Sequence, residues 1–106
     1  PAGSLKRGED PRDAAARECH EEIGLIPSGL IRLGSFYPTP GYCDEDMTFY
    51  RADGLRPPGT GDRTAEQDQD EDIEARPFTP EALRAMIAAG EIVDLKTVAG
   101  LSLIRA

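Results

Sequence analysis

Three glutamates near the start of the chain, Glu18, Glu21 and Glu22, have the side-chain type and the spacing to bind a metal ion. Separations of three and four residues place all three carboxylates on one face of an α-helix. Carboxylate oxygens are the hard ligands that Mg²⁺ and Mn²⁺ prefer. Like charges at this spacing also repel one another, so the alternative is a solvated acidic face balanced by Arg12 and Arg17. The spacing alone leaves both interpretations open.

The neighbouring residues predict the helix that would carry these acids. Asp10, followed by a proline, is a favoured N-cap, and the proline falls at the first helical position, where its missing N–H costs nothing. Gly24 is a favoured helix stop. Ala15, Cys19 and Ile23 recur every four residues on an adjoining face and predict an apolar side that can be buried.

The stretch Gly3–Leu25 resembles the Nudix box, GX5EX7REUXEEXGU, where U is an apolar residue. It matches at every specified position, with Cys19 as the loosest fit. The resemblance implies an α/β fold, the Nudix αβα sandwich with a mixed β-sheet between helices. Nudix domains have several strands before the box, so residues 1–106 are expected to be the C-terminal portion of one such domain.

The resemblance also implies roles for the acids. Glu18 and Glu22 match the principal metal ligands, Glu21 matches an assisting ligand that also serves catalysis, and the backbone carbonyl of Ala2 would complete the shell. Mg²⁺ is the implied cofactor, with Mn²⁺ as the alternative.

Residues of the loop before the helix have structural alternatives as well. Gly3 would let the backbone come close to a metal or a phosphate, or would simply form a tight turn. Glu9 and Arg17 are expected to pair and so to tie this loop to the helix.

After the box, the sequence predicts a turn at residues 26–28, where Pro, Ser and Gly cluster. Residues 30–37 have the composition of a strand, with a bulge at Gly34. Residues 47–52 are expected to pair with it in antiparallel fashion, because the connection is short. The polar, Gly- and Pro-rich residues 54–69 predict a mobile loop.

The end of the chain predicts one more strand and two helices. Residues 73–78 are expected to be a short strand. Thr79, followed by a proline, caps a helix that runs to Gly90, and Asp94 caps the last helix. Its expected apolar stripe comprises Leu95, Val98, Leu101 and Ile104.

Features downstream of the box resemble the ADP-ribose pyrophosphatase subfamily. Pro40 lies at the distance from the box that is typical of these enzymes, with Gly41 and Glu45 close behind, and the resemblance implies that all three contact the substrate. It implies hydrolysis of ADP-ribose, or of a similar nucleoside diphosphate sugar, to AMP and a sugar phosphate. The alternatives are a Nudix hydrolase for a different nucleotide sugar and a module that binds without turnover.

A general base must reach the attacking water, and in this subfamily the base lies on the loop before the last strand. The candidates here are Glu71, then Glu66, then Asp70. Gln69 stands where the subfamily often has an acid, which leaves a charged loop with no catalytic member as the alternative.

Composition narrows the class of partner. Twenty acids against 12 Lys and Arg give a net charge of −8, which argues against a nucleic-acid backbone. No apolar run approaches the roughly 20 residues of a membrane-spanning helix. The two cysteines have neither disulfide-framework nor zinc-site spacing and indicate a reduced, cytoplasmic setting. The resemblance implies a small-molecule substrate and a homodimer for the full-length protein.

Overall fold

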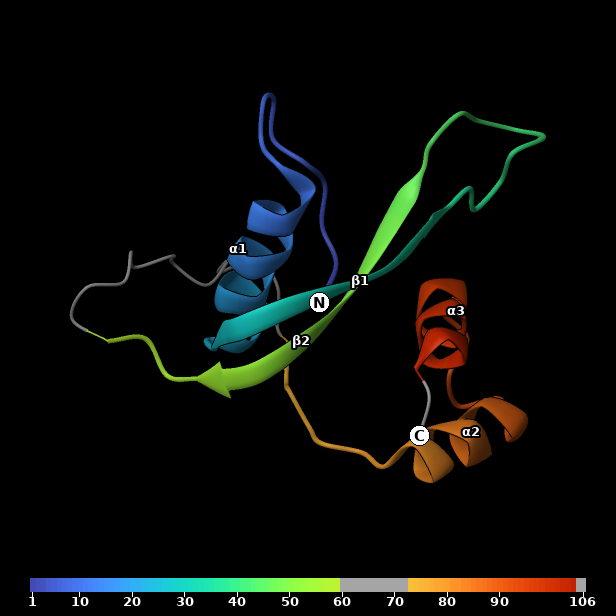
Figure 1. The fold of residues 1–106 in the computed structure, drawn as a ribbon. Helices are drawn as coiled ribbons and strands as arrows, with labels where there is room; N and C mark the ends of the chain where they lie inside the picture. The colour runs from blue at the N-terminus through green and yellow to red at the C-terminus, as the bar shows by residue number, and fades with distance from the viewer. Residues whose placement is uncertain (60–72, 105–106) are drawn as a thin grey trace. The chain divides into compact units, whose positions relative to one another are not determined.

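The computed structural model describes residues 1–59 and 73–104 and divides into two compact units, Pro1–Glu74 and Ala75–Ala106 (Figure 1). Each unit is described by itself. No helix in the described residues is long and apolar enough to cross a membrane. The elements in chain order are α1 (Pro11–Ile23), β1 (Ile26–Phe36), β2 (Met47–Arg56), α2 (Pro80–Ala88) and α3 (Leu95–Leu103).

Helix α1 begins and ends where its sequence predicts. The Asp10 side chain accepts a hydrogen bond from the backbone N–H of Arg12 at 2.8 Å. Gly24 ends the helix with φ of 70°, the left-handed conformation that favours glycine, and its N–H donates to the carbonyl of His20. These local contacts define the two ends of the helix.

Strands β1 and β2 form a two-stranded antiparallel sheet, as the short connection predicted. The register shifts between Arg32 and Gly34, which confirms the expected bulge. The predicted turn at residues 26–28 is wrong, because β1 begins at Ile26 and pairs with the end of β2. Likewise, β2 continues through residues 54–56, which the sequence assigned to a loop.

A side-chain contact explains this longer pairing. The Ser28 hydroxyl donates to the carbonyl of Gly54 at 2.6 Å, across the strands. Pro27 pairs opposite Leu55, and a proline is tolerated there because both strands of a two-stranded sheet are edge strands.

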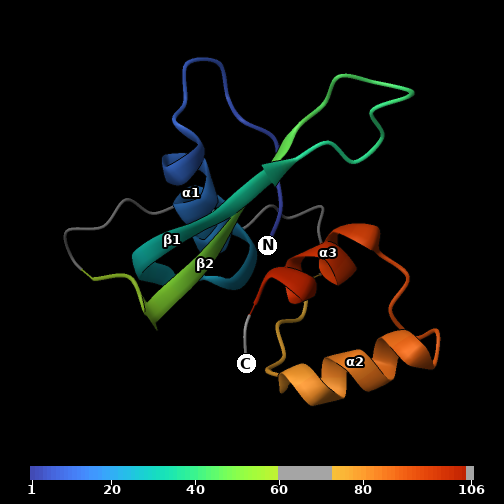
Figure 2. The same cartoon turned by 45° about the vertical axis from the view of Figure 1, so that its right-hand side comes forward.

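Helix α1 lies beside the hairpin in both views (Figures 1 and 2). Its Arg12 donates from Nη1 to the carbonyl of Leu30 at 2.7 Å, and the guanidinium carbon lies 5.7 Å from the centre of the Tyr50 ring. Ala14 and Cys19 are buried, at 5% and 7% exposure. Cys19 therefore belongs to the apolar side of α1, as expected, whereas Ala15 and Ile23 are only half-buried.

The second unit contains the two remaining helices. Thr79 caps α2 by accepting from the N–H of Ala82 at 3.1 Å, and Asp94 caps α3. Leu101 is buried, but Leu95 is 67% exposed and Ile104 lies just beyond the end of the helix, so the expected apolar stripe is shorter than predicted.

One predicted strand is absent from the structure. Residues 73–78 form neither helix nor strand, and the sheet of the described residues consists of β1 and β2 alone. The described residues thus contain helices and one antiparallel hairpin, whereas the mixed part of the expected sheet is not among them.

Candidate active site

The three glutamates of α1 are bonded either to Arg17 of the box or to the backbone of Ala2 just before it. Nη1 of Arg17 donates to Glu18 Oε1 at 2.9 Å and to Glu21 Oε2 at 3.0 Å. Glu22 Oε2 accepts from the backbone N–H of Ala2 at 2.9 Å. Arg17 thus joins Glu18 and Glu21, whereas Ala2 contacts Glu22 through its backbone N–H and not through the carbonyl that was expected to bind the metal.

Arg17 lies at the centre of this network. Besides its two Nη1 bonds, it donates from Nε and Nη2 to the two carboxylate oxygens of Glu9, at 2.9 and 3.0 Å, and from Nη2 to the carbonyl of Ser4 at 3.2 Å. All five N–H groups of the guanidinium are thus used. The predicted pairing of Glu9 with Arg17 is confirmed, and Arg17 also binds Glu18 and Glu21, in line with the alternative that this arginine balances the acidic face. The separation of four residues between Arg17 and Glu21 was an available signal.

The network shifts the titration of its members. The hydrogen bonds from Arg17, with the backbone N–H of Lys6 adding to them, lower the pKa of Glu9 to about 2. The hydrogen bond to Glu9 is the main cause of the raised pKa of Arg17. Burial raises the pKa of Glu18, against the opposing effect of its hydrogen bond from Arg17. Burial also raises the pKa of the Cys19 thiol.

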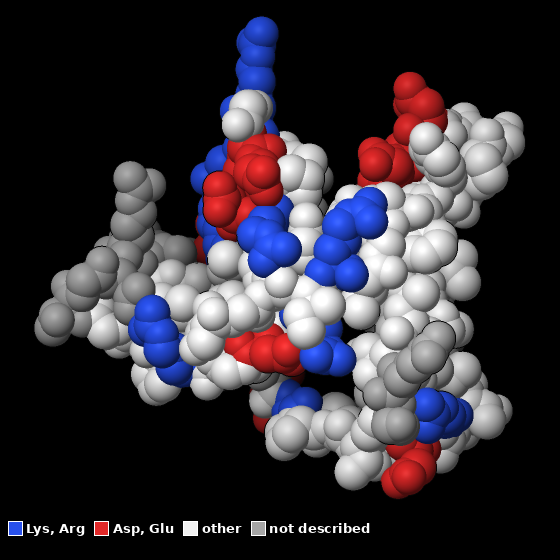
Figure 3. Space-filling model, in the orientation of Figure 1, with Lys and Arg blue, Asp and Glu red and all other residues white. Residues whose placement is uncertain are grey.

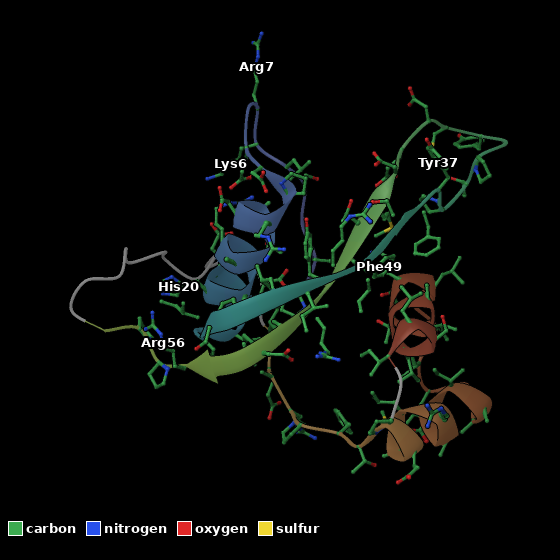
Figure 4. All side chains as sticks on the ribbon, viewed as in Figure 1. Lys6, Arg7, His20, Tyr37, Phe49 and Arg56 are labelled. Carbon is green, nitrogen blue, oxygen red and sulfur yellow. The ribbon has the colours of Figure 1, made fainter. Side chains whose placement is uncertain are left out.

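The loop before α1 lies directly against Glu18 at Gly3. A Cβ atom at position 3 would overlap the Glu18 carboxylate, so only glycine lets the backbone approach this closely. The backbone N–H of Lys6 donates to Glu9 Oε1 at 3.0 Å. This bond ties the loop to Glu9, the residue that also binds Arg17. Lys6 and Arg7 lie at the tip of the loop, where Arg7 points away from the helix (Figure 4).

The residues present suit a hard divalent cation. In the described residues, Glu18 and Glu21 each accept a hydrogen bond through one oxygen, so the other carboxylate oxygens are available as ligands. The structure describes no set of three or more acidic, histidine or cysteine side chains that already surrounds a point suited to a metal ion. Arg17 supplies positive charge beside two of the three acids.

The predicted substrate-contacting residues lie in the loop between β1 and β2. An open hollow of about 430 Å³ is lined by Tyr37, Pro40, Gly41, Tyr42, Cys43 and Asp44. Glu45 does not line it and is exposed. Tyr37 and Arg56 mark opposite ends of the hairpin (Figure 4). No hydrogen bond or ion pair of the described part joins this loop to the acids of α1.

The candidate general bases cannot be placed against this site. Glu71, Glu66 and Asp70, together with Gln69, lie outside the described residues.

Charged side chains of both signs gather side by side over α1 and the loop before it (Figure 3).

Comparison with known families agrees with the motif and the geometry. The model of the NUDIX domain family matches residues 1–99. The chain belongs to the Nudix family, which confirms the α/β fold class and the resemblance on which the site was predicted. Nudix hydrolases generally depend on a divalent metal.

Three curated relatives are 34–38% identical to this chain. An ADP-ribose pyrophosphatase of Bacillus subtilis is 34% identical over 97 residues, covering 92% of this chain and 51% of that protein. A methanol dehydrogenase activator of Bacillus methanolicus is 38% identical over 98 residues, covering 92% and 51%. An ADP-ribose pyrophosphatase of Mycobacterium tuberculosis is 36% identical over 107 residues, covering 100% and 50%. The chain spans about half the length of these curated relatives.

Proposed function

We propose that the whole protein hydrolyses the pyrophosphate of ADP-ribose, or of a related nucleoside diphosphate sugar, to AMP and a sugar phosphate. The observation that supports this best is the grouping of Glu18, Glu21 and Glu22 on one helix against the backbone of Ala2 and Gly3. Two relatives named ADP-ribose pyrophosphatase support the substrate class.

The proposed cofactor is Mg²⁺, with Mn²⁺ as the alternative. Glu18 and Glu22 would be its principal ligands, Glu21 would assist, and the carbonyl of Ala2 would complete the set. A bound divalent ion neutralises charge on the phosphate oxygens and polarises the phosphorus under attack. Arg17 keeps Glu18 and Glu21 in place, since it donates to both from a single nitrogen.

The remaining roles fall to loop residues. Glu71 is the proposed general base, and Glu66 and Asp70 are the next candidates. The base accepts a proton from water while the water oxygen bonds to one phosphorus and the bridging P–O bond breaks. In the loop between β1 and β2, Pro40, Gly41 and Glu45 are the proposed substrate contacts.

The test measures AMP release from a panel of nucleoside diphosphate sugars by the whole protein, with and without Mg²⁺. We expect Glu22→Gln to lower turnover by at least about a hundredfold, because one ligand charge is lost. Glu91→Gln, a matched change at an exposed acid just after α2, should leave turnover unchanged. Turnover by Glu22→Gln near the wild-type level at saturating Mg²⁺ would exclude α1 from the mechanism.

A second candidate is a Nudix module that binds a nucleotide without hydrolysing it. Two observations favour it: Arg17 already engages Glu18 and Glu21, and Gln69 stands where the subfamily often has an acid. Under this candidate the whole protein binds ADP-ribose in a titration and releases no AMP over hours with Mg²⁺ or Mn²⁺. Metal-dependent release well above the uncatalysed background would eliminate it.

We also propose that the whole protein works in the cytoplasm as a homodimer. Both cysteines, Cys19 and Cys43, are free, which suits a reducing compartment. Light scattering on the whole protein would measure the number of subunits, and a monomer at micromolar concentration would contradict the homodimer.

A further inference from the structure

The loop between β1 and β2 presents two tyrosines to one hollow. Tyr37 and Tyr42 are 63% and 92% exposed, and both line the open hollow of about 430 Å³. Neither side chain forms a hydrogen bond or a ring contact within residues 1–59 and 73–104. Tyr50, the third tyrosine of the chain, differs, because the Arg12 guanidinium lies over its ring. The aromatic surface at the hollow is therefore available to a ligand.

Hydrogen bonds define the turn that carries one of these tyrosines. The carbonyl of Thr39 accepts from the backbone N–H groups of both Tyr42 and Cys43, at 3.0 Å each. The Thr39 hydroxyl lies 3.0 Å from Cys43 Sγ and closes the same turn. Pro40, inside the turn, has its φ fixed by its own ring. A backbone that is already bonded in this way lowers the entropy cost of binding a ligand.

The charge at the hollow disfavours a phosphate as its occupant. Asp44 lines the hollow, and Glu45 and Asp46 follow it directly in the sequence. The described residues that line the hollow include neither lysine nor arginine. Carboxylates repel phosphate oxygens, whereas they accept hydrogen bonds from hydroxyl and amino groups. The hollow therefore suits an uncharged group whose edge carries such donors.

A ring with polar groups at its edge meets both requirements. Tyrosine stacks on the face of a nucleobase, whichever base it is. A sugar ring likewise has an apolar C–H face that an aromatic side chain covers, and its hydroxyls donate at its edge. The nucleotide sugars of the proposed function carry one such ring at each end, beyond their two phosphates.

We infer that Tyr37, Tyr42 and Asp44 bind a terminal ring of the nucleotide sugar, either its nucleobase or its sugar. The tyrosines contact the faces of the ring, and the Asp44 carboxylate accepts hydrogen bonds from its edge. The identity of this ligand rests on the proposed function. The contacts involve no phosphate, so they are measured without a metal ion and without turnover.

The experiment uses the whole protein in EDTA and measures the binding of adenosine and of D-ribose by saturation-transfer NMR, which detects weak ligands. Adenosine binding without D-ribose binding assigns the hollow to the nucleobase, and binding of both assigns it to the sugar. Tyr37→Ala and Tyr42→Ala should each weaken binding at least about fivefold, because a stacking surface is lost. Asp44→Ala should weaken it about threefold, because a charged but exposed acceptor is lost.

Two further variants are matched controls. Tyr42→Phe keeps the ring and should bind within about twofold of the wild type. Leu55→Ala removes a side chain that is 45% exposed and lies at the other end of the hairpin, opposite Pro27, and it should not change the affinity.

Three results would overturn the inference: binding of neither probe, wild-type affinity in both tyrosine-to-alanine variants, or equal weakening by Leu55→Ala and Tyr42→Ala. Failure of the proposed function gives a different result. A protein that binds a probe through Tyr42 and releases no AMP with Mg²⁺ would keep the ring site and lose the hydrolysis. One that releases AMP while Tyr37→Ala and Tyr42→Ala bind both probes normally would keep the hydrolysis and lose the ring site.

Discussion

Replacing Arg17 with lysine separates what its charge does from what its shape does. The guanidinium donates to acceptors on several sides at once, including both oxygens of Glu9 and one oxygen each of Glu18 and Glu21. A lysine ammonium has three donors on one nitrogen and cannot span these positions. Arg17→Lys therefore keeps the positive charge and loses at least the two Nη1 bonds if it stays with Glu9.

The expected cost follows from the exposure of the partners. The side chains of Arg17, Glu18 and Glu21 are 19%, 16% and 26% exposed. A hydrogen bond to a charged group contributes about 1.5–3 kcal/mol when buried, and partial exposure lowers this toward about 1 kcal/mol. For two bonds we expect the free energy of unfolding to fall by about 2 kcal/mol, measured by chemical denaturation of the whole protein without metal.

The same variant should weaken metal binding. Groups that orient metal ligands typically change metal affinity by about 10- to 100-fold when replaced, so we expect Mn²⁺ affinity to fall by that factor in a titration followed by electron paramagnetic resonance. Arg51→Lys is the control, because Arg51 is an exposed arginine of β2 that pairs with Asp53 and contacts none of the three acids. If Arg17→Lys bound Mn²⁺ as tightly as the wild type, Arg17 would not be orienting the ligands. If the free energy of unfolding of Arg17→Lys were also unchanged, the bonds from Arg17 to Glu18 and Glu21 would not stabilise the fold.

The remaining predictions concern the loop, its anchor and the base. Gly3→Ala should lower Mn²⁺ affinity with little loss of stability, because its Cβ displaces only the flexible end of Glu18; a large loss of stability and normal affinity would contradict this. The pKa of Glu9 is about 2 in the folded state against 4.5 ordinarily, so its contribution to stability is complete above pH 4.5 and is lost as the pH falls toward 2. Denaturation curves should thus show the advantage of the wild type over Glu9→Gln shrinking across that range, and a pH-independent difference would count against the ion pair. Glu71→Gln should reduce turnover by about 10²- to 10⁴-fold with nearly unchanged metal affinity, and full activity would place the base elsewhere.

Helix boundaries were predictable because their signals are local. Asp10, Thr79 and Asp94 each cap the helix that the sequence assigned to them, since an N-cap needs only its own side chain and the next few backbone N–H groups. The bulge at Gly34 was predictable for a similar reason, because a glycine inside a strand often marks a bulge.

Strand ends were not predictable, because pairing depends on residues distant in the chain. Pro27 and Ser28 have the composition of a turn, yet the bond from Ser28 to Gly54 extends the hairpin past them. Residues 73–78 were predicted as a strand from their composition, but composition does not supply a partner strand. The same contrast between local and distant contacts holds at the site. The burial of Cys19 was predictable from its four-residue spacing along the helix. The bonds of Arg17 to Glu9, Glu18 and Glu21 form only when the loop before α1 folds onto the helix.

The arrangement of the box explains how three like charges coexist on one helix. Glutamates three and four residues apart repel one another, and a helix that carried them without partners would be destabilised. Here one nitrogen of Arg17 neutralises Glu18 and Glu21 together, while the backbone of Ala2 satisfies Glu22. Arg17 in turn is held by Glu9, whose pKa of about 2 keeps the Glu9 carboxylate charged at neutral pH. The box therefore carries its own internal cation, and the contact between the loop and the helix that positions the acids is made through Arg17.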